Sequence, residues 1–118
     1  MAKQTLARSF FNAFRGIKHT LRDRNFVITI MAGIGAVSLS LALGLERGEK
    51  IIILMLTAFV LAAEAMNTAC ERMLDIVTTQ HHPEVARIKD IFAGAVLIYS
   101  VAAFIIGFWI FGNAFMRL

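Results

Sequence analysis

Three long apolar runs constrain the fold of this chain more than any other feature of its sequence. They extend from Phe26 to Leu45, from Ile51 to about Ala69, and from Ile91 to Phe111. A helix rises about 1.5 Å per residue, so about 20 apolar residues are enough to cross a hydrocarbon core about 30 Å thick. We therefore predict an all-α integral membrane protein in which residues 26–45, 51–74 and 90–112 form three transmembrane helices.

The composition agrees with a membrane protein of one domain. Hydrophobic residues make up 58% of the 118 residues, whereas an average soluble domain has about 45–50%. One proline and eight glycines leave no room for a disordered linker. The single cysteine, Cys70, excludes a disulfide within the chain. We predict a single membrane domain over residues 1–118.

The segment before the first run, residues 1–24, has the pattern of an amphipathic helix. At about 100° per residue, its large apolar side chains fall on one side and its basic side chains on the other. The apolar side consists of Leu6, Phe10, Phe14, Ile17 and Leu21, and the basic side of Arg8, Arg15, Lys18 and Arg22. We predict that this helix lies on the membrane surface. The alternative is a helix packed on protein, which a chain with so little soluble protein disfavours.

The distribution of basic residues predicts the orientation in the membrane. Of the twelve Lys and Arg residues, six precede the first run and three more flank the connection between the second and third runs. By the positive-inside rule, the N-terminus and this connection are cytoplasmic and the C-terminus is outside. The same basic residues lie where anionic lipid headgroups would meet them. We therefore expect no binding to nucleic acid.

A polar stripe follows the second apolar run. Its members are three or four residues apart and so share one face of a helix about 16 Å long. They are Glu64, Asn67, Thr68, Glu71 and Asp75. An ionised carboxylate within lipid costs on the order of 2.5–3.5 kcal/mol at the centre of the membrane, and three acids repel one another. Helix packing alone explains the stripe poorly, so we expect a cation as its partner.

Three more charged residues belong to the same boundary of the membrane. Asp23 precedes the first run, and Lys89 and Asp90 precede the third. Carboxylates suit Mg²⁺, which borrows further ligands from phosphate groups, and a lysine is a common partner of phosphate. These residues predict phosphate chemistry at a bilayer surface, without the glycine-rich loop of soluble nucleotide-binding proteins.

The motifs themselves resemble a known family. The string "EAMNTACERMLD", followed fourteen residues later by "KDIFAGAVLI", is similar to the signature of the small prokaryotic diacylglycerol kinases, a family that includes the undecaprenol kinases. "SFFNAFRGI" and "DRNF" resemble the amphipathic helix of that family and its entry into the first span. The loop "DIVTTQHHP" looks more like the undecaprenol kinases of Gram-positive bacteria. The likeness covers nearly the whole chain.

This resemblance implies a homotrimer in the bacterial cell membrane, with active sites on the cytoplasmic side that neighbouring protomers share. The implied reaction transfers the γ-phosphate of ATP, with Mg²⁺, to the hydroxyl of a lipid. Undecaprenol is the expected acceptor, and diacylglycerol is the alternative.

The resemblance also implies roles for individual residues. Glu64 would be the general base on the lipid hydroxyl, with Asn67 orienting Glu64 or the phosphates. Lys89 would contact the transferring phosphate. Glu71 and Asp23 would be ligands of Mg²⁺, although family members commonly have Glu at the position of Asp23.

Further residues would bind the nucleotide. Asp75 and Asp90 would hold the nucleotide or the neighbouring cations in place, together with Lys89. Asn12 and Arg15 of the surface helix would help to close over the nucleotide. His81 and His82 are interpreted as loop residues, because adjacent histidines do not easily share one metal ion.

Two other classes of protein are alternatives. A small proton-coupled transporter would also have an intramembrane glutamate, but its key acid should lie near the middle of the membrane. A purely structural membrane subunit would leave the polar stripe unexplained.

Overall fold

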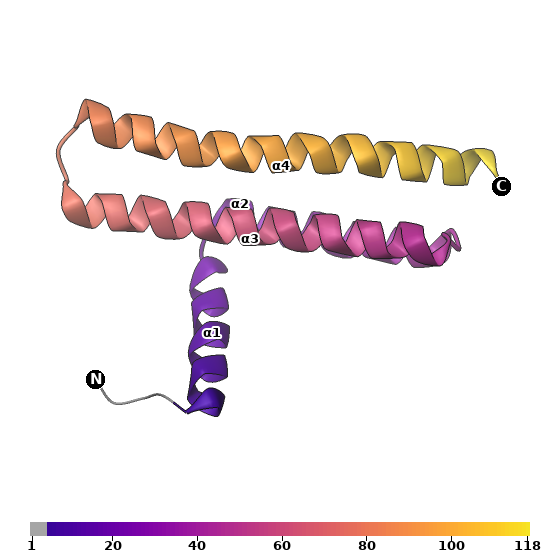
Figure 1. Cartoon of the computed structure of the whole chain (residues 1–118), viewed down its shortest axis with the longest axis horizontal. Helices are drawn as coiled ribbons and strands as arrows, with labels where there is room; N and C mark the ends of the chain where they lie inside the picture. Colours follow the sequence, from indigo (N-terminus) through magenta and orange to yellow (C-terminus); the bar gives the residue numbers. More distant parts are fainter. Residues whose placement is uncertain (1–4) are drawn as a thin grey trace.

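The structure is a computed structural model that describes residues 5–118, and this part of the chain forms four helices. They are α1 (Leu6–Thr20), α2 (Arg24–Ala42), α3 (Arg47–Val77) and α4 (Pro83–Met116). The last three are long and apolar enough to cross a membrane, which confirms the predicted class and the predicted number of spans. Figure 1 shows these three helices running along one direction, with α1 pointing away from them.

Local signals explain where the long helices begin and end. Glu46 and Glu49 form a reciprocal capping box at the start of α3. Pro83 occupies the first turn of α4, and Nδ1 of His82 accepts a hydrogen bond of 3.2 Å from the backbone N–H of Glu84. Gly44, with φ +61°, follows the end of α2 in the left-handed conformation that glycine adopts easily.

Two of the helices continue beyond the spans predicted for them. α3 extends to Val77 and α4 begins at Pro83, whereas the predicted spans end at residue 74 and begin at residue 90. The difference arises because apolar composition marks only the part of a helix that suits lipid. The backbone hydrogen bonds continue into the polar ends, where side chains of the predicted site lie.

Helix α1 projects from the bundle (Figure 1). It covers 6–20 of the predicted segment 1–24, whose first four residues lie outside the described part of the chain. The hydroxyl of Thr5 accepts a hydrogen bond of 3.2 Å from the N–H of Arg8 and so caps the helix. None of the α1 residues is buried, and Leu6, Phe10 and Phe14 are exposed. Its apolar side is therefore open to a membrane surface or to another protein.

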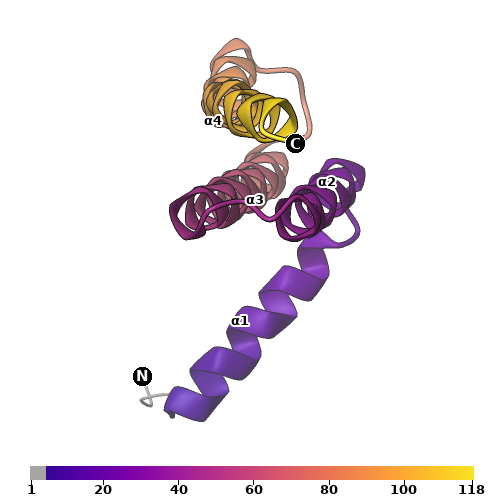
Figure 2. The same cartoon turned by 90° about the vertical axis from the view of Figure 1, so that its right-hand side faces the viewer.

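Helix α3 is the centre of the bundle, because it packs against both α2 and α4. In the end-on view of Figure 2, α2 lies on one side of α3 and α4 on another. The buried core lies away from the polar stripe and consists of Leu45, Ile53, Ile110 and Ala114. Near the same end, the Arg117 guanidinium lies 3.0 Å from a carboxylate oxygen of Glu49 and ties the end of α4 to α3.

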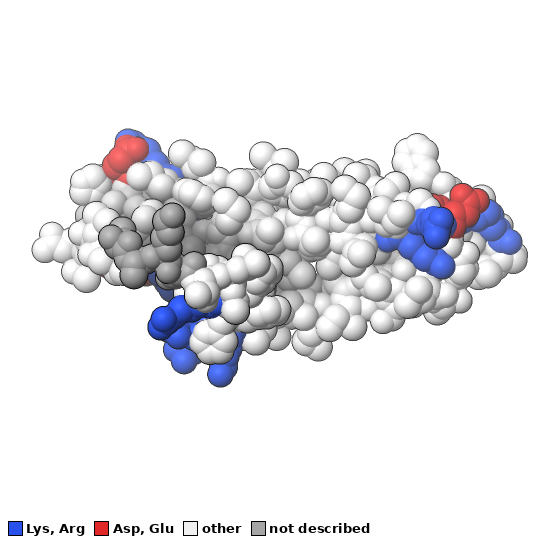
Figure 3. Space-filling view, turned by 60° about the horizontal axis from the view of Figure 1, so that its bottom comes forward, with Lys and Arg blue, Asp and Glu red and all other residues white. Residues whose placement is uncertain are grey.

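Charged side chains are gathered at the two ends of the bundle. In Figure 3 they appear at both ends and on the projecting helix, with an uncharged surface between the ends. Many large apolar residues along α2, α3 and α4 are exposed in the single chain, including Ile34, Leu54 and Phe104. Such a surface suits lipid or other protein chains, because neither requires it to be polar.

Helices α2 and α3 approach each other closely at Gly33. A Cβ atom at this position would lie 2.4 Å from Cγ2 of Thr57, so even alanine does not fit without a shift of the backbone or of the threonine. Threonine is branched at Cβ and has little rotamer freedom in a helix. The absence of a side chain at Gly33 therefore sets the distance between the two helices.

We expect Gly33→Ala to lower the free energy of unfolding in detergent by about 1–3 kcal/mol, because the added methyl group overpacks the contact with Thr57. Gly35→Ala is the matched control, since a Cβ at Gly35 meets nothing within 4 Å. It should leave the stability unchanged or raise it slightly. Equal stabilities of the two variants in denaturant titrations would contradict the close approach.

Candidate active site at one end of the bundle

Helix α3 carries the polar stripe from a half-buried to an exposed environment. Its periodicity of 3.6 residues per turn places the stripe on one face. Glu64 and Asn67 are half-buried, Thr68 is buried, and Glu71 and Asp75 are exposed. The polar face therefore runs from the level at which α1 leads into α2, part-way along α3, toward the end of α3 and the start of α4 (Figure 1).

Asp23 is brought to this face by two hydrogen bonds. Its Oδ1 accepts from the backbone N–H of Asn25 at 3.1 Å, so Asp23 is the N-cap of α2. Its Oδ2 accepts from the hydroxyl of Thr68 at 2.5 Å, although the two residues are 45 positions apart in sequence. The second bond places a predicted metal ligand beside the polar stripe.

Three carboxylates therefore lie in one region. The negative charges of Asp23 and Glu71 both act unfavourably on a charge at Glu64. A nearby cation, or donors of hydrogen bonds to the carboxylates, would offset this unfavourable interaction. The arrangement agrees with the expectation of a cation partner that the spacing of the stripe suggested.

Asn67 contributes an amide that is incompletely paired. Its Nδ2 donates a long hydrogen bond of 3.4 Å to Oε1 of Glu71. Its Oδ1 is buried and has no hydrogen-bond partner in the described part of the chain. A buried polar atom without a partner costs stability, and few such atoms occur in native structures. This oxygen is free to accept a hydrogen bond or to face a cation.

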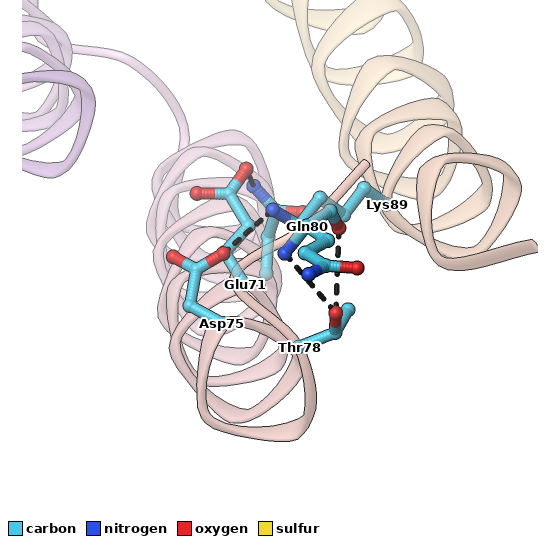
Figure 4. Close-up of polar contacts among 6 residues, drawn as sticks. Glu71, Asp75, Thr78, Gln80 and Lys89 are labelled. Carbon is cyan, nitrogen blue, oxygen red and sulfur yellow. Dashed lines mark hydrogen bonds and ion pairs between the residues drawn. The ribbon is translucent and has the colours of Figure 1, made fainter. Parts of the chain in front are cut away.

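Lys89 of α4 pairs with Asp75 of α3 across the connection between the two helices. The Nζ atom lies 2.7 Å from Oδ1 of Asp75, and Figure 4 shows this pair beside Glu71. The connection itself is closed by a hydrogen bond of 3.1 Å from the N–H of Gln80 to Oγ1 of Thr78. The pair thus joins a carboxylate of the stripe to a cation that could bind phosphate.

A cavity of about 560 Å³ opens beside this ion pair. It is lined by Asp75, Thr78, Thr79, Gln80, His81, His82, Val85, Ala86 and Lys89. The lining provides hydroxyl, amide and imidazole groups, together with one cation and one carboxylate. Such a mixture can bind a polar, phosphate-bearing molecule. No residue pattern predicted this cavity, because it depends on how the connection folds back.

Three of the predicted site residues do not lie beside the polar stripe within a single chain. Asp90 is exposed on α4, and Asn12 and Arg15 are exposed on α1, which leads away from the bundle (Figure 1). One contact between α1 and α3 is a hydrogen bond of 3.3 Å from the Arg72 guanidinium to the carbonyl of His19. Arg72 had no predicted role, and no spacing rule links it to His19.

The carboxylates suit Mg²⁺ if other ligands come from elsewhere. Among the described residues, no group of three or more His, Cys, Asp or Glu side chains could hold a metal ion. Mg²⁺ is usually bound by one or two carboxylates together with waters and substrate phosphates. Asp23 and Glu71 supply hard oxygen ligands of that kind. The donor set therefore fits Mg²⁺ bound together with a nucleotide.

Comparisons with known proteins agree with the motifs. The model of the family described as prokaryotic diacylglycerol kinase matches residues 11–111. An undecaprenol kinase from Bacillus subtilis is 37% identical over 105 residues, which cover 88% of this chain and 85% of that protein. A diacylglycerol kinase from Synechocystis is 34% identical over 101 residues, which cover 84% of this chain and 58% of that protein.

We expect Asn67→Leu to keep or raise the thermal stability of the metal-free protein, because it removes a buried oxygen that lacks a partner, a group that costs about 1–3 kcal/mol. Asn67→Asp is the contrasting variant. It adds a fourth carboxylate near Asp23, Glu64 and Glu71 and should lower the melting temperature. A lower melting temperature for Asn67→Leu than for Asn67→Asp would contradict this description of the site.

Proposed function

This chain is a lipid kinase that belongs to the prokaryotic diacylglycerol kinase family, and we propose that it transfers the γ-phosphate of ATP to undecaprenol. One observation carries the proposal: Lys89, paired with Asp75, lies beside a cavity with polar side chains in its lining and beside a group of carboxylates, at one end of membrane-spanning helices. A lipid hydroxyl and a water-soluble nucleotide can meet at such a boundary.

Undecaprenol is proposed ahead of diacylglycerol for two reasons. The undecaprenol kinase is the relative with the higher identity and the more complete coverage of both chains. The connection "DIVTTQHHP" also looks more like that of the undecaprenol kinases. Diacylglycerol is the alternative acceptor, since the relative from Synechocystis carries that name.

Glu64 is proposed as the general base. It is the acid of the stripe nearest to the middle of the apolar run and is half-buried, so a lipid hydroxyl at the interface can reach it from the bilayer. Its carboxylate takes the hydroxyl proton while the lipid oxygen forms a bond to the γ-phosphorus. The bond from the γ-phosphorus to the oxygen that bridges it to the β-phosphorus breaks, and ADP leaves with that oxygen.

Lys89 and the nearby acids are proposed to position the phosphates. Phosphoryl transfer requires mainly alignment of the reacting atoms and neutralisation of charge. Lys89 donates hydrogen bonds to phosphate oxygens, and Asp75 keeps the ammonium group in place. Asp23 and Glu71 would hold Mg²⁺, which neutralises the charge of the phosphates when it is bound. Asn67 would orient Glu64 or a phosphate oxygen through the amide described above.

The cavity beside Lys89 is proposed to receive part of the nucleotide. Its volume of about 560 Å³ lies in the range of about 300–1,000 Å³ that small-molecule sites occupy. Thr78, Gln80 and the histidines offer hydrogen bonds to polar atoms of such a molecule. Asp90, Asn12 and Arg15 are proposed to complete the nucleotide site when neighbouring chains assemble.

A homotrimer is proposed because one chain does not enclose the site. Large apolar surfaces of α2, α3 and α4 are exposed in the single chain, and Asn12 and Arg15 lie on α1, which projects from the bundle (Figure 1). We propose that the active site faces the cytoplasm and that the C-terminus lies on the outer side of the bacterial cell membrane, because the basic residues are concentrated at the end of the bundle that carries the site.

The kinase relatives favour this function over the transporter alternative.

The purified protein in lipid should transfer radiolabelled phosphate from MgATP to undecaprenol. Glu64→Gln should lower kcat by at least about a hundredfold, because it removes the general base, and should leave the oligomer intact on gel filtration. Absence of phosphorylation of both lipids by the wild type would overturn the kinase reaction. Equal rates on undecaprenol and diacylglycerol would overturn only the choice of acceptor.

Glu71→Gln should raise the Mg²⁺ concentration needed for half-maximal activity by about tenfold or more, because it replaces a charged ligand by a neutral one. The measurement is a Mg²⁺ titration at saturating ATP with correction for the MgATP complex. Glu84→Gln is the control, since Glu84 pairs with Arg87 on the surface of α4. An unchanged titration for Glu71→Gln would contradict its role as ligand.

A further inference from the structure

We propose that Thr68 is a positioning residue, whose hydroxyl holds the Asp23 carboxylate against α3 in the orientation in which it binds the divalent cation. This inference rests on the proposed function, because it assigns to Asp23 the role of a metal ligand. Thr68 belongs to the polar stripe, but neither its spacing nor the resemblance assigned it a role of its own.

The bond between Thr68 and Asp23 has the features of a strong interaction. The Thr68 hydroxyl donates to a carboxylate oxygen at 2.5 Å, and hydrogen bonds to ionised groups are stronger than those between neutral groups. Thr68 has only 6% of its surface exposed, so water competes little for its hydroxyl. A charge-assisted hydrogen bond in a shielded position restricts the carboxylate more than a bond at the surface would.

The acceptor of the Thr68 hydroxyl differs from the acceptors of other helical threonines in this structure. A threonine within a helix commonly donates to the carbonyl four residues earlier. Thr29 donates to Asn25 O and Thr57 to Ile53 O, both at 2.9 Å. Thr68 instead donates to a residue that precedes another helix. Its hydroxyl therefore links two elements rather than satisfying its own helix.

The second oxygen of Asp23 is also held, so the plane of the carboxylate is determined. Oδ1 accepts from the N–H of Asn25 at 3.1 Å as the cap of α2. Each carboxylate oxygen has two lone pairs, and one bond on each leaves one lone pair free. Two bonds from different elements thus orient the group while keeping acceptor sites for a cation.

The position of Thr68 on α3 explains why the bond matters for the neighbouring acids. Glu64 is four residues before it and Glu71 three residues after it, so all three share one face of the helix. Asp23 is therefore held between the proposed base and the proposed second ligand, and both Asp23 and Glu71 act on the charge of Glu64. Without the hydroxyl, repulsion would move Asp23 away from the other two carboxylates.

The test compares Thr68→Val, which removes the hydroxyl and keeps the shape, with Thr68→Ser, which keeps the hydroxyl. Thr57→Val is the matched control, because the Thr57 hydroxyl bonds only to its own helix. The first measurement is Mn²⁺ binding, followed by electron paramagnetic resonance, with a non-hydrolysable ATP analogue and without lipid acceptor. The second is the Mg²⁺ titration of kinase activity.

Loss of the hydrogen bond that orients a metal ligand typically lowers metal affinity by about 10–100-fold. Thr68→Val should therefore weaken Mn²⁺ binding by at least about tenfold and raise the Mg²⁺ requirement by a similar factor, with kcat at saturating Mg²⁺ within about threefold of wild type. Thr68→Ser and Thr57→Val should both stay within about threefold of wild type in metal affinity. If Thr68→Val does not fold, Thr68→Ala provides the same loss of the donor.

The outcomes separate this inference from the proposed function. A wild type that phosphorylates a lipid, together with Thr68→Val that binds Mn²⁺ like wild type, overturns the inference alone, even if the melting temperature falls. A wild type that is inactive on both lipids but binds Mn²⁺ in a manner that depends on Thr68 overturns the proposed function alone. Equal losses in Thr68→Val and Thr57→Val would show a purely structural effect and also overturn the inference.

Discussion

The hydrocarbon interior of a membrane satisfies neither backbone hydrogen bonds nor charges, and the rest of this structure depends on that constraint. The backbone has to bond within each segment, so the spanning parts are helices. On the face shown in Figure 3, charged side chains lie at the two ends of the bundle and on the projecting helix α1. The polar stripe is the exception, since it brings Glu64 and Asn67 into half-buried positions of α3. Polar groups in such positions lower the stability of the folded chain, and their presence therefore indicates a function.

The features that disfavour stability in the site are the ones that the proposed chemistry uses. The charges of Asp23 and Glu71 both act unfavourably on a charge at Glu64, and Asn67 has a buried oxygen without a partner in the described chain. A divalent cation and a triphosphate would offset both. Elsewhere α2 and α3 are in close contact at Gly33 and Thr57, so α3 supports the site from within the bundle. The Asp75–Lys89 pair then connects this support to α4.

Much of the site could be predicted from the sequence, because its central part lies on one helix. Residues three or four positions apart share a face whatever the surroundings, so Glu64, Asn67 and Glu71 were grouped from spacing alone. Asp23 and Lys89 were assigned to the same membrane boundary because they flank the apolar runs, whereas the individual roles came from the resemblance to a kinase family. The nucleotide-binding roles of Asn12 and Arg15 remain predictions, because in a single chain these residues lie on α1, apart from the stripe.

The sequence by itself determined the class of fold, the number of spans and the polar face of α3, since periodicity and length act within one segment. Only the tertiary structure decided that Thr68 bonds to Asp23, that Gly33 faces Thr57 and that the connection before α4 lines an open cavity. These contacts join segments far apart in the chain. They depend on the angle and rotation of each packed helix, and no local pattern of residues encodes those quantities.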